Sequence, residues 1–239
     1  MSIFAIADLH LSLSNPEKSM DVFGPGWNGY INRIKEAWEE TVTSDDTVLV
    51  SGDISWATYI ENAKEDFEFI NSLPGRKLLS RGNHDYWWTT IAKMEKVLAD
   101  WGFDSIGFVR TNAVECEGTL ITGTRGWNPP KSVSDYTEED KKIYLREIER
   151  TKIAIRELDK ADPNRERKRI FMIHFPPTMK DLTNTELSDL MDEGGIDICV
   201  YGHLHGRSHR FVNPEGTGKE TRYICTSSDY LGFRPVKIL

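Results

Sequence analysis

Several features are scarce or missing in this sequence, and each absence excludes a class of protein. Only three of the 239 residues are cysteine, and none are closely paired, so we expect buried reduced thiols and not a disulfide scaffold. No apolar stretch approaches the roughly 20 residues of a membrane-spanning helix, and no membrane partner is expected. The first apolar run, Ile3 to Ala7, follows no basic segment and is too short for a signal peptide. These features predict a cytoplasmic protein.

Positive charge is also in the minority. The 30 Lys and Arg residues are outnumbered by 38 Asp and Glu residues, which gives a formal net charge of -8 with neutral histidines. This balance argues against nucleic acid or an anionic membrane as a partner bound through bulk charge. A phosphate substrate remains possible if metal ions supply positive charge locally. The length suits one α/β domain over residues 1–239, with room for an insertion. The oligomeric state is left open.

Five short apolar runs each end in a group of polar side chains. The runs are rich in Ile, Val or Leu, as buried parallel strands are, and helical periodicity separates the first three. In an open α/β sheet, ligands gather beyond the carboxyl ends of the strands. The runs would therefore bring one set of residues to a single edge: Asp8, His10, Asp53, Asn83, His84, His174, His203 and His205.

The residue types in this set are typical of a transition-metal site. Five of the six histidines directly follow an apolar run and stand near Asp or Asn, which chance rarely produces. Imidazole, carboxylate and one amide oxygen, without thiolate, suit Mn²⁺, Fe or Zn²⁺ better than Ca²⁺. The groups are too many for one ion, whereas two ions about 3.5–4 Å apart, bridged by a carboxylate, would use them all. The sixth histidine, His209, lies in a predicted strand over 209–212, where we expect a surface or cross-strand role.

As an ordered set, the motifs resemble those of the calcineurin-like metallophosphoesterase family. The matching motifs span most of the chain and are Asp8-x-His10, Gly52-Asp53, Gly82-Asn83-His84-Asp85, His174 and Gly202-His203-x-His205. The resemblance implies a two-sheet αβ sandwich with a dinuclear metal site.

The resemblance also implies a role for each residue. One ion would be bound by Asp8, His10 and His205. The other would be bound by Asn83, His174 and His203. Asp53 would bridge the two ions, and His84 would face the substrate phosphate without binding metal.

Physical chemistry agrees with these roles. Two divalent ions contribute about +4, and Asp8, Asp53 and a bridging hydroxide about -3, so the site would attract phosphate. The hydroxide would attack phosphorus in line. Asn83 and His84, the catalytic candidates, would donate to the non-bridging oxygens. The sequence thus predicts hydrolysis of small phosphomonoesters or phosphodiesters with two divalent transition-metal ions, Mn²⁺ favoured.

One motif departs from the protein Ser/Thr phosphatases of that family. Their second motif reads Gly-Asp-x-Val-Asp-Arg-Gly, and its second Asp orients the catalytic histidine. Here that position is Trp56, and no Arg follows. The departure counts against a protein phosphatase, and it leaves Asp85 as one candidate for orienting His84. Two other functions stay open: a non-catalytic metal-binding or interaction module on the same fold, and a nuclease, which the acidic balance disfavours.

A loop and a helix, at about residues 125–168, interrupt the alternation of strands and helices. The helix has one apolar stripe and an acidic first turn, so we predict that it packs on the domain. The loop from Arg125 to Pro130 either overhangs the site and restricts it to small esters, or lies on a remote face. Arg125 and Arg207 could hold phosphate, although a surface role is favoured for each. One or two of six loop aromatics could form an apolar wall for an organic group: Trp27, Trp56, Tyr86, Trp87, Trp88 and Trp127.

Overall fold

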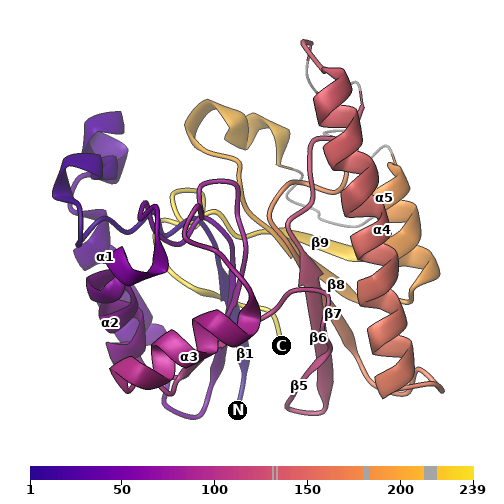
Figure 1. Cartoon of the computed structure of the whole chain (residues 1–239), viewed down its shortest axis with the longest axis horizontal. Helices are drawn as coiled ribbons and strands as arrows, with labels where there is room; N and C mark the ends of the chain where they lie inside the picture. The colour runs from indigo at the N-terminus through magenta and orange to yellow at the C-terminus, as the bar shows by residue number, and fades with distance from the viewer. Residues whose placement is uncertain (131, 133, 180–183, 213–219) are drawn as a thin grey trace.

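Two five-stranded sheets lie face to face at the centre of the molecule, and helices cover their outer faces (Figure 1). The structure is a computed structural model that describes residues 1–130, 132, 134–179, 184–212 and 220–239. The arrangement confirms the predicted α/β class and the two-sheet αβ sandwich.

The first sheet carries the N-terminal half of the chain. Its order is β10-β1-β2-β3-β4, and its pairs are parallel except for the edge pair of β10 with β1. Its strands are β1 (Ile3–Ile6), β2 (Thr47–Ser51), β3 (Arg76–Ser80), β4 (Ile106–Phe108) and β10 (Val236–Lys237).

The second sheet follows the same plan. Its order is β5-β6-β7-β8-β9, and only the edge pair of β5 with β6 is antiparallel. Its strands are β5 (Val114–Cys116), β6 (Thr119–Thr124), β7 (Arg169–Ile173), β8 (Ile198–Tyr201) and β9 (Arg222–Cys225).

Alternate residues of the central strands pack in two directions. In β1, Ile3 and Ala5 face the second sheet, whereas Phe4 and Ile6 belong to the core under the helices. A strand buried on both faces is apolar at successive positions and not at every second one. This is why the site-bearing runs appear in the sequence as continuous apolar segments.

Three helices cover the first sheet and two cover the second (Figure 1). The first group is α1 (Tyr30–Thr41), α2 (Lys64–Ser72) and α3 (Ile91–Trp101), and the second is α4 (Glu138–Ala161) and α5 (Glu186–Glu193). Short 3-10 helices occupy Pro16–Lys18, Met20–Phe23, Pro25–Trp27, Ile60–Asn62 and Gly206–Phe211. Within the described residues, none of the helices combines the length and apolar character needed to cross a membrane.

Helix α4 has the predicted single apolar face. Thr137 and Asp140 form a reciprocal cap at its start, and Tyr144, Ile148 and Leu158 are buried against the second sheet. The helix contacts β6 and α5. It therefore packs on the sandwich, while the single-domain span of 1–239 and the bounds of the insertion stay predictions.

The predicted strand over residues 209–212 is wrong. This segment belongs to the 3-10 helix Gly206–Phe211, and its side chains show no alternation between buried and exposed. The ring of His209 instead lies beside the site, with its Nε2 3.1 Å from Asp229 Oδ2.

Candidate metal centre

The carboxyl ends of β1, β2, β3, β7 and β8 meet at one edge of the sandwich. Four of the residues that follow these strands have a left-handed backbone: Asp8 (φ 60°), His10 (φ 45°), Asp53 (φ 52°) and His203 (φ 73°). Non-glycine residues adopt this conformation uncommonly, and such strain gathers at functional sites. The strained turns are tied to each other, since Asp8 N donates to Gly52 O over 2.9 Å and His10 N to Asp53 O over 2.9 Å.

Two glycines of the motifs allow close approach of neighbouring loops. Gly52 has a φ of 92°, and a Cβ there would lie 2.7 Å from His174 Nδ1. A Cβ on Gly202 would lie 2.6 Å from Asp8 Oδ2. A larger residue at either position would push apart the strand ends that form the site.

Asp8, His10 and His205 form one group of possible metal ligands. Their ligand atoms all lie within 4.8 Å of one another. The Nε2 atoms of His10 and His205 face each other at 3.3 Å, and His205 Nε2 lies 3.4 Å from Asp8 Oδ1. Two imidazole nitrogens and a carboxylate oxygen pointing at one spot are a donor set suited to a divalent transition metal.

A second group surrounds the amide oxygen of Asn83. Asn83 Oδ1 lies 2.9 Å from His174 Nε2 and 3.1 Å from His203 Nδ1. Asp53 Oδ2 lies 3.3 Å from His174 Nε2 and 3.7 Å from His10 Nε2. The Asp53 carboxylate thus sits between the two groups.

All seven predicted ligands are therefore neighbours, although which ion each would bind stays a prediction. Asp8 also approaches the second group, because its Oδ1 lies 3.8 Å from His174 Nδ1. That nitrogen is engaged elsewhere, at 3.0 Å from the carbonyl oxygen of Ser51. Because Nδ1 contacts Ser51, His174 Nε2 is the nitrogen that could bind a metal ion, and it lies on the side of Asp53 and Asn83.

Asp229 supports the site and was missed by the sequence reasoning. Its Oδ1 lies 2.9 Å from Nδ1 of His205, and its Oδ2 accepts a hydrogen bond from Gly206 N over 3.0 Å. A carboxylate on the far ring nitrogen fixes the tautomer and orientation of a metal-binding histidine. Asp229 follows strand β9, so the pattern that revealed the other site residues, an apolar run followed by an acid, was also present here.

Asp85, the candidate for orienting the ring of His84, bonds to backbone and to the indole of Trp87 instead of to that ring. Its buried carboxylate accepts hydrogen bonds from the backbone N–H groups of Asp53 (2.9 Å), Ile54 (2.8 Å) and Gly82 (2.7 Å). These bonds join the loop after β2 to the loop after β3. Asp85 therefore holds the backbone of these two loops in place, and it affects the site by positioning Asp53.

Trp56 is the residue that packs on His84. The two ring centroids are 4.5 Å apart, and Trp56 also stacks on His10 at 5.0 Å with an interplanar angle of 21°. Nδ1 of His84 is buried without a hydrogen-bond partner among the described residues, while His84 Nε2 lies 4.0 Å from Asp53 Oδ2. An aromatic contact thus stands where protein phosphatases have a carboxylate.

The pKa values of three site histidines are lowered. Burial disfavours the charged imidazolium, and it lowers the pKa of His10 to about 4. Burial, reinforced by the positive charge of His174, lowers the pKa of His203 to about 3. The pKa of His84 is also lowered, again chiefly by burial. These three rings are neutral at pH 7.

The other two histidines are held protonated by carboxylates. Burial opposes the charge of His174, but Asp53 and Asp8 outweigh it and raise the pKa of His174 to about 9. At His205, Asp8 and Asp229 likewise outweigh burial and raise the pKa to about 10. In the metal-free site, the positive charges of the His174 and His205 rings therefore offset the negative charges of the carboxylates.

Three of the six predicted aromatics lie at the site, and three pack elsewhere. Besides Trp56, the ring of Trp27 lies 5.6 Å from His205, and Tyr86, which is 60% exposed, lies 6.4 Å from His84. Trp87 and Trp88 belong to the core under the helices. Trp127 is half-buried, with its ring 4.8 Å from Phe175 and its Nε1 donating to Asp140 over 3.0 Å.

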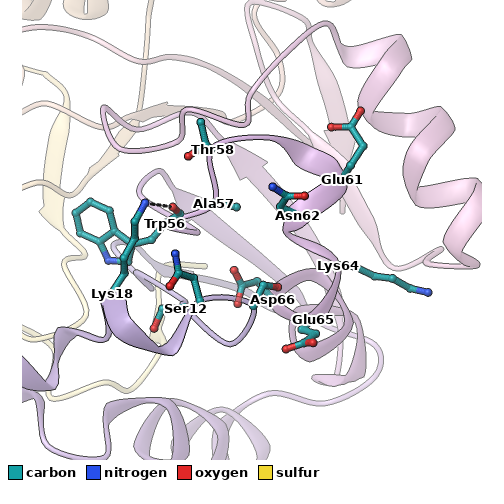
Figure 2. A pocket seen from close by; sticks show the side chains of 12 residues that line it. Ser12, Lys18, Trp56, Ala57, Thr58, Glu61, Asn62, Lys64, Glu65 and Asp66 are labelled. Carbon is teal, nitrogen blue, oxygen red and sulfur yellow. Dashed lines mark hydrogen bonds between the residues drawn. The ribbon is translucent and has the colours of Figure 1, made fainter.

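One cavity lies beside Trp56, and another adjoins the candidate metal centre at His203. A polar cavity of about 410 Å³ has Trp56, Ser12, Lys18 and Asp66 in its wall, and Lys18 Nζ donates to the Trp56 carbonyl over 3.2 Å (Figure 2). A second cavity, of about 300 Å³, is lined by residues of the 125–130 loop and of the segment after β8: Asn128, Pro129, His203, Leu204 and Phe211, with others. The loop therefore reaches the site, although Trp127 itself is not among the residues that line this cavity. Arg125 lies in a separate cluster near Glu147, and Arg207 is exposed.

Comparisons with known proteins agree with the fold and with the motifs. The model of the calcineurin-like phosphoesterase family matches residues 1–207. No curated protein matches the chain in sequence.

Several solved structures share the fold. Phosphopantetheinyl hydrolase from Mycobacterium tuberculosis is 12% identical, with a TM-score of 0.56 over 100% of this chain and 95% of that one. The protein of unknown function AQ665 from Aquifex aeolicus is 17% identical, with a TM-score of 0.50 over 99% and 95%. The protein TT1561 of Thermus thermophilus is 14% identical, with a TM-score of 0.52 over 85% and 81%. At these identities the likeness concerns the fold alone.

Proposed function

The chain belongs to the calcineurin-like phosphoesterase family, and we propose that it hydrolyses small phosphomonoesters or phosphodiesters with the aid of two divalent transition-metal ions. The observation that carries the proposal is the position of Asp53. Its Oδ2 lies 3.3 Å from His174 Nε2 and 3.7 Å from His10 Nε2, between two groups of ligand atoms. A carboxylate so placed is suited to bridge a pair of ions.

The residues present fit such ions. In the first group, the Nε2 atoms of His10 and His205 face each other at 3.3 Å, so a cation would take the place of the proton that the His205 imidazolium holds between them. We assign Asp8 to this group as well. In the second group, Asn83, His174 and His203 would hold the other ion. Nitrogen and oxygen donors without thiolate favour Mn²⁺, with Fe or Zn²⁺ as alternatives.

Bound ions would supply an acidified water and neutralise charge on the phosphate. The protein supplies the geometry around them. The buried carboxylate of Asp85 holds the backbone of Asp53 and Gly82 in place. His84 is 36% exposed at its side chain, and Trp56 packs on its ring, so a neutral imidazole is presented to solvent at the edge of the site. Its role would be to hydrogen-bond the non-bridging oxygens of the phosphoryl group.

The surroundings of the centre favour small esters. The cavity beside His203 (about 300 Å³) could take one organic group of the ester. A net charge of -8 disfavours nucleic acid as substrate. One structural neighbour is itself named a hydrolase, phosphopantetheinyl hydrolase, which is consistent with this proposal. Three free, buried cysteines are in keeping with a cytoplasmic location.

The test combines metal analysis with turnover. Mn²⁺-loaded protein should hydrolyse bis(p-nitrophenyl) phosphate or p-nitrophenyl phosphate and should carry two ions per chain. Asp53→Asn should lose both ions, because it removes the shared carboxylate charge. His84→Ala should keep both ions and lose about 10²-fold or more in turnover, the usual scale for a lost acid or transition-state donor.

The alternatives give different results. Two tightly bound ions with no turnover of any phosphate ester would indicate a binding module. Faster cleavage of DNA than of either small ester would indicate a nuclease. Full activity in Asp53→Asn, with both ions retained, would show that the ligand assignment is wrong.

A further inference from the structure

Four arginines line one small cavity outside the candidate metal centre. They are Arg81, Arg110, Arg125 and Arg150, which come from the ends of β3, β4 and β6 and from helix α4. Val109, Thr111 and Thr124 complete the lining, and the cavity has a volume of about 20 Å³. None of these residues is among the proposed metal ligands.

Acidic groups do not balance this cluster. Glu147 is fully buried, with its Oε1 2.5 Å from Arg150 Nη1 and 4.0 Å from Arg125 Nη2. Its Oε2 is taken up by the backbone N–H of Gly126. Burial, reinforced by neighbouring arginines, lowers the pKa of both Arg81 and Arg125, while Asp85 at Arg81 and Glu147 at both residues act in the opposite direction. Four guanidinium groups against two buried carboxylates, Glu147 and, near Arg81, Asp85, leave the cavity with a net positive charge.

Three donors of the cavity lining lack a partner. Nε of Arg81, Nε of Arg125 and Oγ1 of Thr124 are buried and make no hydrogen bond to any residue that the structure describes. An unsatisfied buried donor is costly, so native proteins normally satisfy it with protein, water or an ion. Unpaired donors in a positively charged cavity therefore point to an anion.

We propose that this arginine pocket binds a tetrahedral oxyanion, such as inorganic phosphate or the terminal phosphoryl group of a larger molecule. A cavity of about 20 Å³ has room for one water-sized group, hence for one oxygen of the anion. The other oxygens lie at the mouth, where the more exposed guanidinium groups of Arg110 and Arg150 can bind them in pairs.

The pocket adjoins two backbone segments of the metal centre. Arg81 directly precedes Gly82-Asn83-His84 in the chain. The carbonyl oxygen of Arg125 accepts hydrogen bonds from His174 N (3.0 Å) and Phe175 N (3.2 Å). A bound oxyanion would neutralise the repulsion between Arg81 and Arg125 and so hold both segments in place. The proposal does not depend on the phosphoesterase function.

The test measures sulfate binding to the purified full-length protein. Sodium sulfate is titrated at constant ionic strength, kept with sodium chloride, and the thermal midpoint is followed. We expect saturable stabilisation of the wild type. Arg150→Gln should weaken the apparent affinity about tenfold or more, because it removes a charge-assisted pair of hydrogen bonds. Lys152→Gln, a change of the same kind on another face of α4, should leave the affinity unchanged.

A second variant covers the case in which Arg150→Gln unfolds because Glu147 loses its partner. Arg110 is exposed, and its side chain makes no ion pair with the residues described, so Arg110→Gln should fold and bind sulfate a few-fold more weakly. Titrations with phenylphosphonate and with inorganic phosphate distinguish a phosphoryl group of a larger molecule from a free ion. Equal binding of the two points to the phosphoryl group of a larger molecule. Much weaker binding of phenylphosphonate points to the free ion. Stabilisation that does not saturate, or that is equal in all four proteins, would overturn the proposal.

Discussion

Loading the metal-free protein with Mn²⁺ at different pH values should release protons from two particular histidines. Asp53 and Asp8 raise the pKa of His174 to about 9, against the effect of burial, and Asp8 and Asp229 raise that of His205 to about 10. Both rings are therefore protonated at neutral pH in the absence of metal. An imidazole must be neutral to bind a metal ion, so each ring has to give up its proton.

The magnitude follows from these values. At about pH 7.5, binding of two ions should release about two protons, because His10 and His203 are already neutral, with pKa values of about 4 and about 3. Ionisation of bound water adds at most about one more. With two protons released, the product of the two association constants should rise about a hundredfold per pH unit between roughly pH 7 and pH 9.

Calorimetric titration in buffers of different ionisation enthalpy measures the number of protons directly. PIPES and Tris serve at the same pH, and the slope of the observed heat against buffer enthalpy should lie between about two and three protons per two ions. A slope below one would refute the reasoning, since it would mean that His174 and His205 are neutral before metal arrives. The raised pKa values also make the stability of the metal-free protein depend on pH. Because their folded pKa values exceed the unfolded value near 6.5, both rings stabilise the metal-free protein fully below about pH 6.5, and this stabilisation is lost as the pH rises toward 10.

Three substitutions test the supporting residues. Asp229→Asn removes one carboxylate beside His205, so the number of protons released on metal loading should fall toward one. Metal binding should weaken about 10- to 100-fold. An unchanged affinity would place Asp229 outside the site. Trp56→Ala should lower kcat about tenfold or more with metal content kept, because the ring of His84 loses its packing partner. Trp56→Phe should restore most of this loss. Equal kcat in the wild type and both variants would mean that the contact has no catalytic effect. Asp85→Ala leaves four buried backbone N–H groups unpaired, those of Asp53, Ile54, Ser55 and Gly82, and should cost about 3–5 kcal/mol in urea unfolding. A cost under about 1 kcal/mol would contradict the assigned role.

The sequence alone predicted that residues nearly 200 positions apart share one site. His10 and His205 face each other at 3.3 Å, and nothing local to either residue indicates the other. The inference worked because parallel strands place all their carboxyl ends at one edge, so recognising five buried runs fixed the neighbours of their last residues. The runs themselves are recognisable because both faces of each central strand are buried.

The supporting contacts could not be predicted in the same way. Asp85 was visible as part of a motif, but its contact with the backbone of Asp53 depends on how two loops fold against each other. Stacking of Trp56 on His84 likewise depends on loop conformation, which strand periodicity does not determine. The strand prediction for residues 209–212 is wrong because propensity is a weak guide where tertiary packing outweighs it, and this segment forms a 3-10 helix beside Asp229.

The backbone of the site indicates that its geometry is built by the fold before any ion binds. Asp8, His10, Asp53 and His203 all have positive φ, and such conformations cost ~1–3 kcal/mol each. Contacts made by the protein alone hold these residues there, including the Asp85 carboxylate on the N–H of Asp53 and the Asp8 carboxylate on that of His203. An ion would therefore enter a strained but formed site, and its binding energy would be available to displace protons from His174 and His205 instead of ordering the loops.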